Sequence, residues 1–185
     1  SAEQITARRI AAESGLSIGR LMVGRDLSDA EQAKLANAAS VLSTHDFRLN
    51  RAPGASVSDI AQAAHLTKNL RLVVVDYLGL VRSDERGLSI YERVTKNSAA
   101  LKALARALNV PILCLCQLNR ASEQRTDKQP SMADLRDSGA IEQDADAVIL
   151  LHRPAEREAK QPLPWEAQPL TAIVAKNRHG NTGRL

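Results

Sequence analysis

The first 69 residues carry apolar positions at helical spacing. Residues 2–13 place Ile5 and Ile10 with small residues on one side of a helix, and Gly15 follows as a stop. Ser28 followed by Glu31 is the pattern of a helix N-terminus, and apolar residues recur at helical spacing after it. A third helix is predicted over residues 56–66, and residues 47–49 are a candidate short strand. We therefore expect residues 1–69 to be mainly helical.

The pattern changes at residue 70, where unbroken apolar runs begin. Residues 70–75 form a β-branched run closed by Asp76, and a run without polar alternation is typical of a strand covered on both faces, as in a parallel sheet. Helical spacing over residues 91–108 and an apolar run over residues 110–116 complete a strand–helix–strand unit. Two more apolar runs, at residues 147–151 and 170–175, bring the predicted sheet to at least four strands.

These patterns predict the α/β fold class, with a mainly parallel sheet flanked by helices. A length of 185 residues favours one domain over residues 1–185, made of a helical segment (1–69) and a strand-rich core (70–185). In sheets of this kind the chemistry lies at the carboxyl ends of the strands. We therefore expect Asp76, Gln117 and the residues after Leu151 to meet at one edge.

Composition and charge exclude several classes of protein. Hydrophobic residues make up 44% and charged residues 25% of the chain, which excludes a disordered or fibrous protein, and the net charge of +4 is a mild excess. With only four aromatic residues, the chain cannot grip single-stranded bases mainly by stacking. No apolar run approaches the roughly 20 residues that span a membrane, and the N-terminus has no apolar signal core. We expect a cytoplasmic protein.

The cysteines and histidines show neither a disulfide pattern nor the spacing of metal ligands. Cys114 and Cys116 flank one residue in an apolar run, where thiols are usually small buried hydrophobes, so a disulfide framework is excluded. The four histidines are scattered without metal-ligand spacing. We expect no zinc site.

Four ordered motifs resemble the ATPase domain of DnaB-type replicative DNA helicases, over residues 71–183. The motifs are LVVVDYLGL, LKALARALNVPILCLCQLNR, PSMADLRDSGAIEQDADAVILLHR and IVAKNRHGNTG. Four motifs in order, the third of them long, are much harder to meet by chance than one short pattern. The resemblance implies a RecA-like P-loop NTPase core that is incomplete on its N-terminal side.

The phosphate-binding Walker A motif, G-x-x-x-x-G-K-[ST], does not occur in the 185 residues. None of the seven lysines follows a glycine or precedes a serine or threonine. The resemblance implies that this loop, and the glutamate that activates the attacking water, precede Ser1 in the family. Without the loop and its lysine the triphosphate loses most of its positive surroundings, so we expect this chain alone not to hydrolyse ATP.

The resemblance assigns the nucleotide site to two strand ends. Asp76 would hold the Mg²⁺ that bridges the phosphates of ATP, and Gln117 would sense the γ-phosphate. On spacing alone, Asp76 is better explained as the cap of a strand, and Gln117 is equally well explained as a polar residue that marks a strand end. Gly79 and Cys116 depart from the family pattern, which commonly has Gln and Ser at these positions.

A polar stretch between two apolar runs contains the candidate DNA-binding loop. The resemblance assigns Arg136, Asp137, Ser138 and Gly139 to the loop that lines a central channel and holds the phosphates of single-stranded DNA without reading their sequence. On the mixed charges of this stretch alone, an ordinary solvated surface loop is the better explanation.

Lys176 and Arg178 are two residues apart in a predicted strand, so both side chains project to the same face. The resemblance implies that this pair reaches across a subunit interface to the neighbour's γ-phosphate, the role of an arginine finger. A finger that acts in trans implies a homo-oligomer, here a hexameric ring of the full-length protein. The alternative is a basic strand edge that discourages pairing with other strands.

The resemblance thus implies part of a motor that couples ATP hydrolysis to translocation on single-stranded DNA and to duplex unwinding. ATP and Mg²⁺ would be its cofactors, and primase and a helicase loader its protein partners. The missing Walker A motif leaves open a non-catalytic RecA-like module that binds DNA or a helicase subunit. A primase-helicase or recombinase-like ATPase matches the residues SGAIEQDAD and KNRHG less well.

Overall fold

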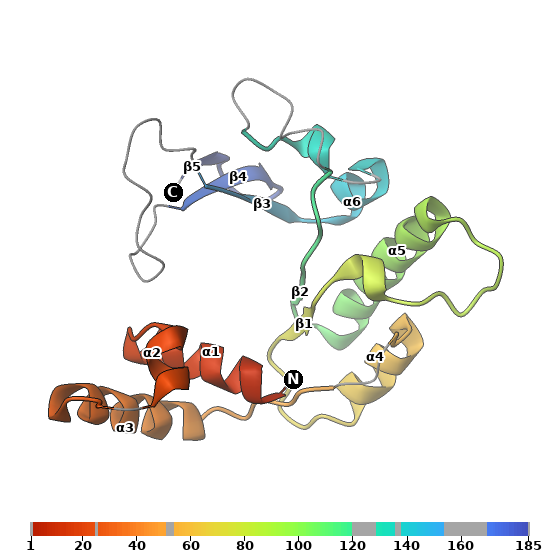
Figure 1. The fold of residues 1–185 in the computed structure, drawn as a ribbon. Helices are drawn as coiled ribbons and strands as arrows, with labels where there is room; N and C mark the ends of the chain where they lie inside the picture. Colours follow the sequence, from red (N-terminus) through yellow and green to blue (C-terminus); the bar gives the residue numbers. More distant parts are fainter. Residues whose placement is uncertain are drawn as a thin grey trace. The chain divides into compact units, whose positions relative to one another are not determined.

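The structure is a computed structural model, and its residues fall into two compact units, described separately below (Figure 1). It describes residues 2–24, 26–50, 54–119, 129–135, 138–153 and 170–184. The first unit contains α1 (Ala2–Ser14), α2 (Ile18–Val23) and α3 (Asp29–Ser43). The second contains α4 (Val57–His65), β1 (Val73–Val75), η1 (Leu78–Leu80), α5 (Ile90–Leu108), β2 (Ile112–Cys114), η3 (Met132–Asp134), α6 (Ser138–Asp144), β3 (Ala147–His152), β4 (Thr171–Asn177) and β5 (Gly183–Arg184).

In the first unit, the helices predicted at residues 2–13 and after Ser28 are present as α1 and α3. The short helix α2 was not predicted, because six residues are too few to show a helical period. Ser17 starts it, with its hydroxyl accepting a hydrogen bond from the Arg20 amide at 3.2 Å. Gly24 ends it with a φ of 60°, a conformation that glycine adopts without strain.

Buried alanines lie on α1 and α3, and an ion pair connects α2 to α3. Ala11 of α1 and Ala38 of α3 are both buried, and alanine lets two helices approach closely. Arg20 of α2 binds Glu31 of α3 with an Nε–Oε1 distance of 3.0 Å. The candidate strand at residues 47–49 is wrong: these residues form no strand, and Phe47 lies against the guanidinium of Arg9, whose Cζ is 4.2 Å from the ring centre.

In the second unit, β1 and β2 pair in parallel, as predicted. Val73 lies opposite Ile112, and Val75 lies opposite Cys114. The helix that joins them, α5, starts at a capping box in which Ser89 and Glu92 bond each other's backbone amides. It ends at Asn109 in the left-handed conformation. The strand–helix–strand unit expected from the apolar pattern is therefore confirmed.

The main core lies between this strand pair and the helices α4 and α5. Its buried members are Val75, Leu78, Val81, Val94 and Leu101. A second, smaller core joins β3 and β4 to the chain that continues beyond β2; its buried members are Leu135, Val148 and Leu150. Ile141 of α6 packs against both cores and so connects them.

The later strands differ from the expected single sheet of at least four strands. In the described residues β1 and β2 form one sheet, while β3, β4 and β5 form another that is antiparallel throughout. The unpredicted β5 pairs with β4 after a tight turn. An apolar run indicates that a strand is buried but not in which direction its neighbour runs, so the pattern could not reveal this arrangement.

The strands are also less covered than their sequences suggest. Val75 is buried under α5, whereas Val74, Leu113 and Ile149 are 53%, 51% and 57% exposed. Successive strand residues point to opposite faces, so these exposed residues mark the second face of each sheet. That face is apolar but is not buried by the described residues.

Shortening a core side chain should destabilise the second unit. We predict that Leu101→Ala lowers the free energy of unfolding by about 2–4 kcal/mol, because it leaves a cavity among Val75, Leu78 and Val94. The matched control is Leu66→Ala, since Leu66 is 75% exposed and its truncation should cost less than about 1 kcal/mol. Urea unfolding of both variants measures the difference, and equal losses would show that Leu101 does not belong to a packed core.

The bonds of Glu31 should make the first unit sensitive to acid. Its hydrogen bonds with Arg20 and then with Ser28 lower the pKa of the Glu31 carboxyl from 4.5 to about 2. A carboxyl with a lowered pKa in the folded state contributes stability above its unfolded pKa, and this contribution is lost as the pH falls toward 2. We predict that Glu31→Gln is less stable than the unchanged protein at pH 6 but loses less stability between pH 4.5 and 2, measured by urea unfolding at each pH. Parallel pH profiles would contradict the assignment.

Candidate nucleotide-binding and subunit-contact sites

Asp76 lies at the carboxyl end of β1, directly after the buried Val75. Its side chain is exposed and makes no hydrogen bond or ion pair within the described part of the chain. The backbone on either side is held by β2, since the Leu115 amide donates to the Val75 carbonyl and the Leu78 amide donates to the Leu115 carbonyl, both at 2.9 Å. The backbone around Asp76 is therefore held in place, and its carboxylate is accessible.

Gln117 lies three residues beyond β2 and is also exposed. The chain beyond it is anchored by an isolated bridge between Leu118 and Leu135, and by the Asn119 amide, which donates to the Asp134 carbonyl at 2.7 Å. Because β1 and β2 are parallel, Asp76 and Gln117 emerge at the same edge. The structure thus brings these two predicted site residues to one edge of the sheet.

The basic pair that the sequence predicted lies where β4 ends. Lys176 is the second-last residue of this strand, and Arg178 directly follows its last residue. The ammonium of Lys176 bonds the carbonyl of Glu142, and Nη2 of Arg178 donates to the carbonyl of Gln143 at 3.0 Å. Both acceptors belong to the last turn of α6, where helix carbonyls have no partner inside the helix. The pair therefore caps α6 and lines a surface pocket with Gly139, Glu142 and Gln143.

Asp146, directly before β3, forms the centre of a charged cluster with Arg178. Its Oδ1 is 3.1 Å from Nη1 of Arg178, and its Oδ2 bonds the ammonium of Lys102 on α5. The Arg178 amide also donates to the Asp146 carbonyl at 2.7 Å. The hydrogen bond from Lys102 is the main cause that lowers the pKa of the Asp146 carboxyl, so it stays ionised at neutral pH. Asp146 was not predicted as a site residue from the sequence. The available signal was its place directly before an apolar run, β3, whose partner strand β4 ends in the basic pair.

The predicted DNA-binding loop is described only in part. Arg136 and Asp137 lie outside the described residues. Ser138 is the first residue of α6, and Gly139 follows it in the helix. Gly139 lines the same pocket as Lys176 and Arg178, so the start of α6 and the basic pair share one surface.

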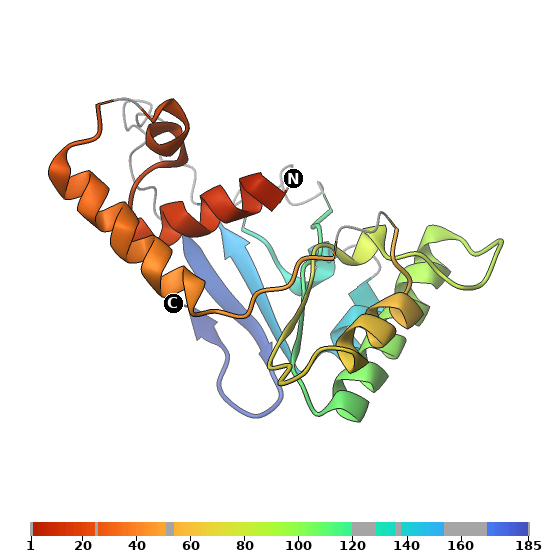
Figure 2. The same cartoon turned by 90° about the horizontal axis from the view of Figure 1, so that it is seen from below.

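Within one chain, the two groups of predicted residues do not meet. Asp76 and Gln117 emerge where β1 and β2 end, whereas Arg178 is bonded to the residue that precedes β3. Figure 2 shows the turn between β4 and β5 at the end of the unit where β2 and β3 begin. One chain therefore presents an acid–amide edge at one end of its strands and a basic pair at the other.

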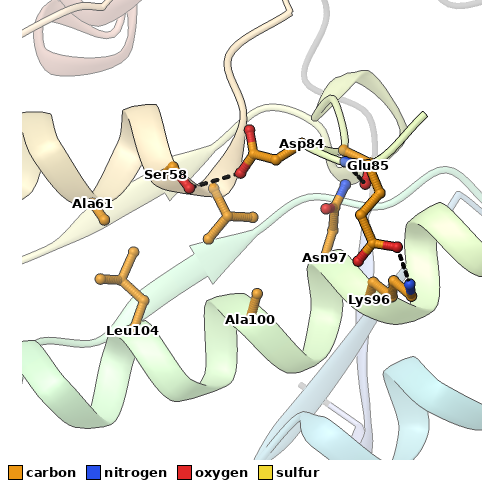
Figure 3. Close-up of a pocket in the computed structure, with 10 residues that line it drawn as sticks. Ser58, Ala61, Asp84, Glu85, Lys96, Asn97, Ala100 and Leu104 are labelled. Atoms are coloured by element: carbon orange, nitrogen blue, oxygen red, sulfur yellow. Dashed lines mark hydrogen bonds and ion pairs between the residues drawn. The ribbon is translucent and has the colours of Figure 1, made fainter.

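The second unit also has a pocket between α4 and α5 that contains no predicted site residue (Figure 3). Leu104 and Ala61 form its apolar wall, and polar contacts close its rim: Ser58 donates to Asp84 at 2.7 Å, and Lys96 binds Glu85. Asn97 is buried at its side and donates to the Val81 carbonyl at 2.9 Å. These bonds tie the chain at residues 83–85 to both helices.

Neither cysteine forms a disulfide, and both lie at the edge of the core. Burial raises the pKa of the Cys114 thiol to about 11, so this thiol is protonated at neutral pH and is a poor metal ligand. Among the described residues, no three His, Cys, Asp or Glu side chains are grouped so as to hold a metal ion. In the same part of the chain, none of the helices has the length and apolar character of a membrane span.

Comparison with known proteins decides the family. The profile of the DnaB-like helicase C-terminal domain matches residues 1–185. The chain belongs to this family. The replicative DNA helicase DnaB of Mycobacterium leprae is 40% identical over 185 residues, which cover 98% of this chain and 30% of the relative. That of Geobacillus stearothermophilus is 36% identical, with 100% of this chain and 41% of the relative covered.

Solved structures agree with this assignment. A DnaB-like replicative helicase, described with its interactions with primase, has a TM-score of 0.83 at 30% identity and covers 97% of this chain and 43% of that chain. An ATPase domain has a TM-score of 0.85 at 29% identity, covering 100% of this chain and 66% of that chain. The α/β fold is therefore the RecA-like fold of DnaB-like ATPase domains, and the family resemblance of the sequence motifs is confirmed. The chain spans only 30% to 41% of the two curated relatives named above.

Proposed function

We propose that the full-length protein is a replicative DNA helicase, in which this chain forms part of the motor that couples ATP hydrolysis to movement along single-stranded DNA. Membership of the DnaB-like family supports this function. The observation that carries it is the split arrangement of charge: a free carboxylate and an amide at one end of the strands, and a basic pair at the other. Where two copies meet head to tail in a ring, the acid–amide edge of one copy and the basic pair of the next would lie at one nucleotide.

In this proposal Asp76 would hold Mg²⁺, and the side-chain amide of Gln117 would donate a hydrogen bond to the γ-phosphate of ATP. The carboxylate of Asp76 is exposed and has no partner among the described residues, which fits a magnesium ion, since this ion prefers oxygen ligands and keeps several waters. When bound, the ion offsets the negative charge of the phosphates. The parallel pairing of β1 and β2 keeps Asp76 and Gln117 at one edge, which supports the proposal that the carboxylate and the amide serve the same nucleotide.

Lys176 and Arg178 act on the nucleotide of the neighbouring copy. Each side chain is tied to α6 by a carbonyl acceptor, and a cationic side chain so held is oriented before it meets a phosphate. The role in trans requires a ring of subunits, which we propose is a hexamer. We further propose that Arg136, Asp137, Ser138 and Gly139 hold the phosphates of one DNA strand, and that primase and a helicase loader bind the full-length ring.

Mixed oligomers test the shared site. In the full-length protein, Asp76→Asn and Arg178→Ala should each lower the kcat of ATP hydrolysis by about 10³-fold, because one removes the metal ligand and the other the positive charge at the γ-phosphate. When the two variants are mixed, some interfaces combine the intact Asp76 of one subunit with the intact Arg178 of the next. We predict that ATP hydrolysis recovers on mixing.

The control is Arg106→Ala, an exposed arginine of α5 with no place in the proposed site, which should leave kcat unchanged. If the mixed oligomers stay as inactive as their components, the site is not shared between subunits. If Arg178→Ala alone retains full kcat, Arg178 is not a finger.

The 185 residues by themselves should not hydrolyse ATP. None of their lysines lies in the context that a phosphate-binding loop requires. We predict that the isolated chain shows no ATP turnover above that of its Asp76→Asn variant, measured by release of inorganic phosphate with and without single-stranded DNA. Turnover that disappears on Asp76→Asn would contradict this and would place a complete site within these residues.

A further inference from the structure

Asp146 is bonded to Arg178 by both its backbone and its side chain. The Arg178 amide donates to the Asp146 carbonyl at 2.7 Å, and Nη1 of Arg178 lies 3.1 Å from Asp146 Oδ1. Resting on the proposed role of Arg178, we propose that Asp146 is a positioning residue: it orients the Arg178 guanidinium toward the nucleotide of the neighbouring subunit without itself touching that nucleotide.

The anchors of Arg178 lie at both ends of its side chain. The backbone bond to Asp146 fixes where the side chain starts, and the bonds of Nη1 to Asp146 and of Nη2 to the Gln143 carbonyl fix where it ends. A guanidinium carries five N–H donors in a planar fork, so these two bonds leave donors free for a phosphate. The side chain is thus held in one direction while it retains the means to bind an anion.

Lys102 completes the arrangement from a different element. Its ammonium bonds Asp146 Oδ2, so the two carboxylate oxygens are divided between Lys102 of α5 and Arg178 of β4. A carboxylate held on one side by a helix of the core cannot turn freely to follow Arg178. Lys102 also favours the ionised form of Asp146, which lowers the pKa of the carboxyl and preserves the acceptor for Arg178.

The exposure of the Arg178 and Asp146 side chains indicates that their ion pair serves positioning more than stability. The side chains of Arg178 and Asp146 are 46% and 51% exposed. Ion pairs that exposed contribute little to folding, because water competes with each partner. A small displacement of a charged group at a reacting phosphate, in contrast, changes the rate strongly, since phosphoryl transfer depends on position and charge. Asp146 should therefore affect kcat far more than it affects stability.

A double-mutant cycle in the full-length protein tests the proposal. Asp146→Ala should lower the kcat of ATP hydrolysis by about 10-fold or more and change KM for ATP by less than about twofold, because Arg178 is misplaced while Asp76 and Gln117 remain intact. Asp146→Asn keeps an acceptor oxygen toward Nη1 but loses the charge, so it should retain more activity than Asp146→Ala. In the Arg178→Ala background, Asp146→Ala should cause no further loss.

The outcomes separate the positioning role of Asp146 from the proposed role of Arg178 as a finger. A full loss with Arg178→Ala but no loss with Asp146→Ala overturns the positioning role and leaves the finger intact. Losses that multiply in the double variant also overturn it, because Asp146 would then act independently of Arg178. No loss with Arg178→Ala overturns both.

The control is Glu85→Ala, another carboxylate that pairs with a lysine of α5, remote from Arg178. It should leave kcat unchanged. Thermal unfolding of every variant checks folding. Should Asp146→Ala fail to fold, the cycle is repeated with Asp146→Asn, which should lower kcat by itself but cause no further loss when Arg178→Ala is compared with Asp146→Asn/Arg178→Ala. A fall of kcat in Glu85→Ala equal to that in Asp146→Ala would overturn the specific role of Asp146.

Discussion

The parallel pairing of β1 with β2 is the constraint on which the rest of the second unit depends. Two short strands share one direction because α5 connects them and buries Val94 and Leu101 against Val75. Once the strands are parallel, the residues that follow them must emerge together. Asp76 and Gln117 are 41 positions apart in the chain, and only this pairing makes them neighbours at one edge.

The opposite end of the unit is organised by α6 and not by a sheet edge. This helix is seven residues long, and its first residues belong to the proposed DNA-binding loop. Its last carbonyls accept from Lys176 and Arg178, and Ile141 packs against both cores. Ile141, between the two ends of the helix, is partly buried. In the proposed function, contact with DNA and contact with the neighbour's nucleotide therefore lie at the two ends of one short helix.

In the proposed function, the acid–amide edge and the basic pair of one chain belong to two different nucleotide sites. Each proposed site is complete only where two copies meet, so in this proposal each subunit senses the nucleotide state of its neighbour through side chains such as Arg178. The charged cluster of Lys102, Asp146 and Arg178 is partly exposed in the single chain. It is thus available to a neighbour at the surface where the proposed interface lies.

The sequence alone determined α1 and α3 of the first unit, the strand–helix–strand unit and the family, because helical period, unbroken apolar runs and ordered motifs are local properties of the chain. The ends of apolar runs made Asp76 and Gln117 candidates, and the resemblance to the family supplied their roles and those of Lys176 and Arg178. Only the tertiary structure decided that β3, β4 and β5 form an antiparallel sheet, because a buried run contains no information on the direction of its neighbour. The partners of Arg178 were equally beyond the sequence, since Lys102, Gln143 and Asp146 come from separate segments of the chain. A hydrogen bond between such segments exists only after packing has set their distance.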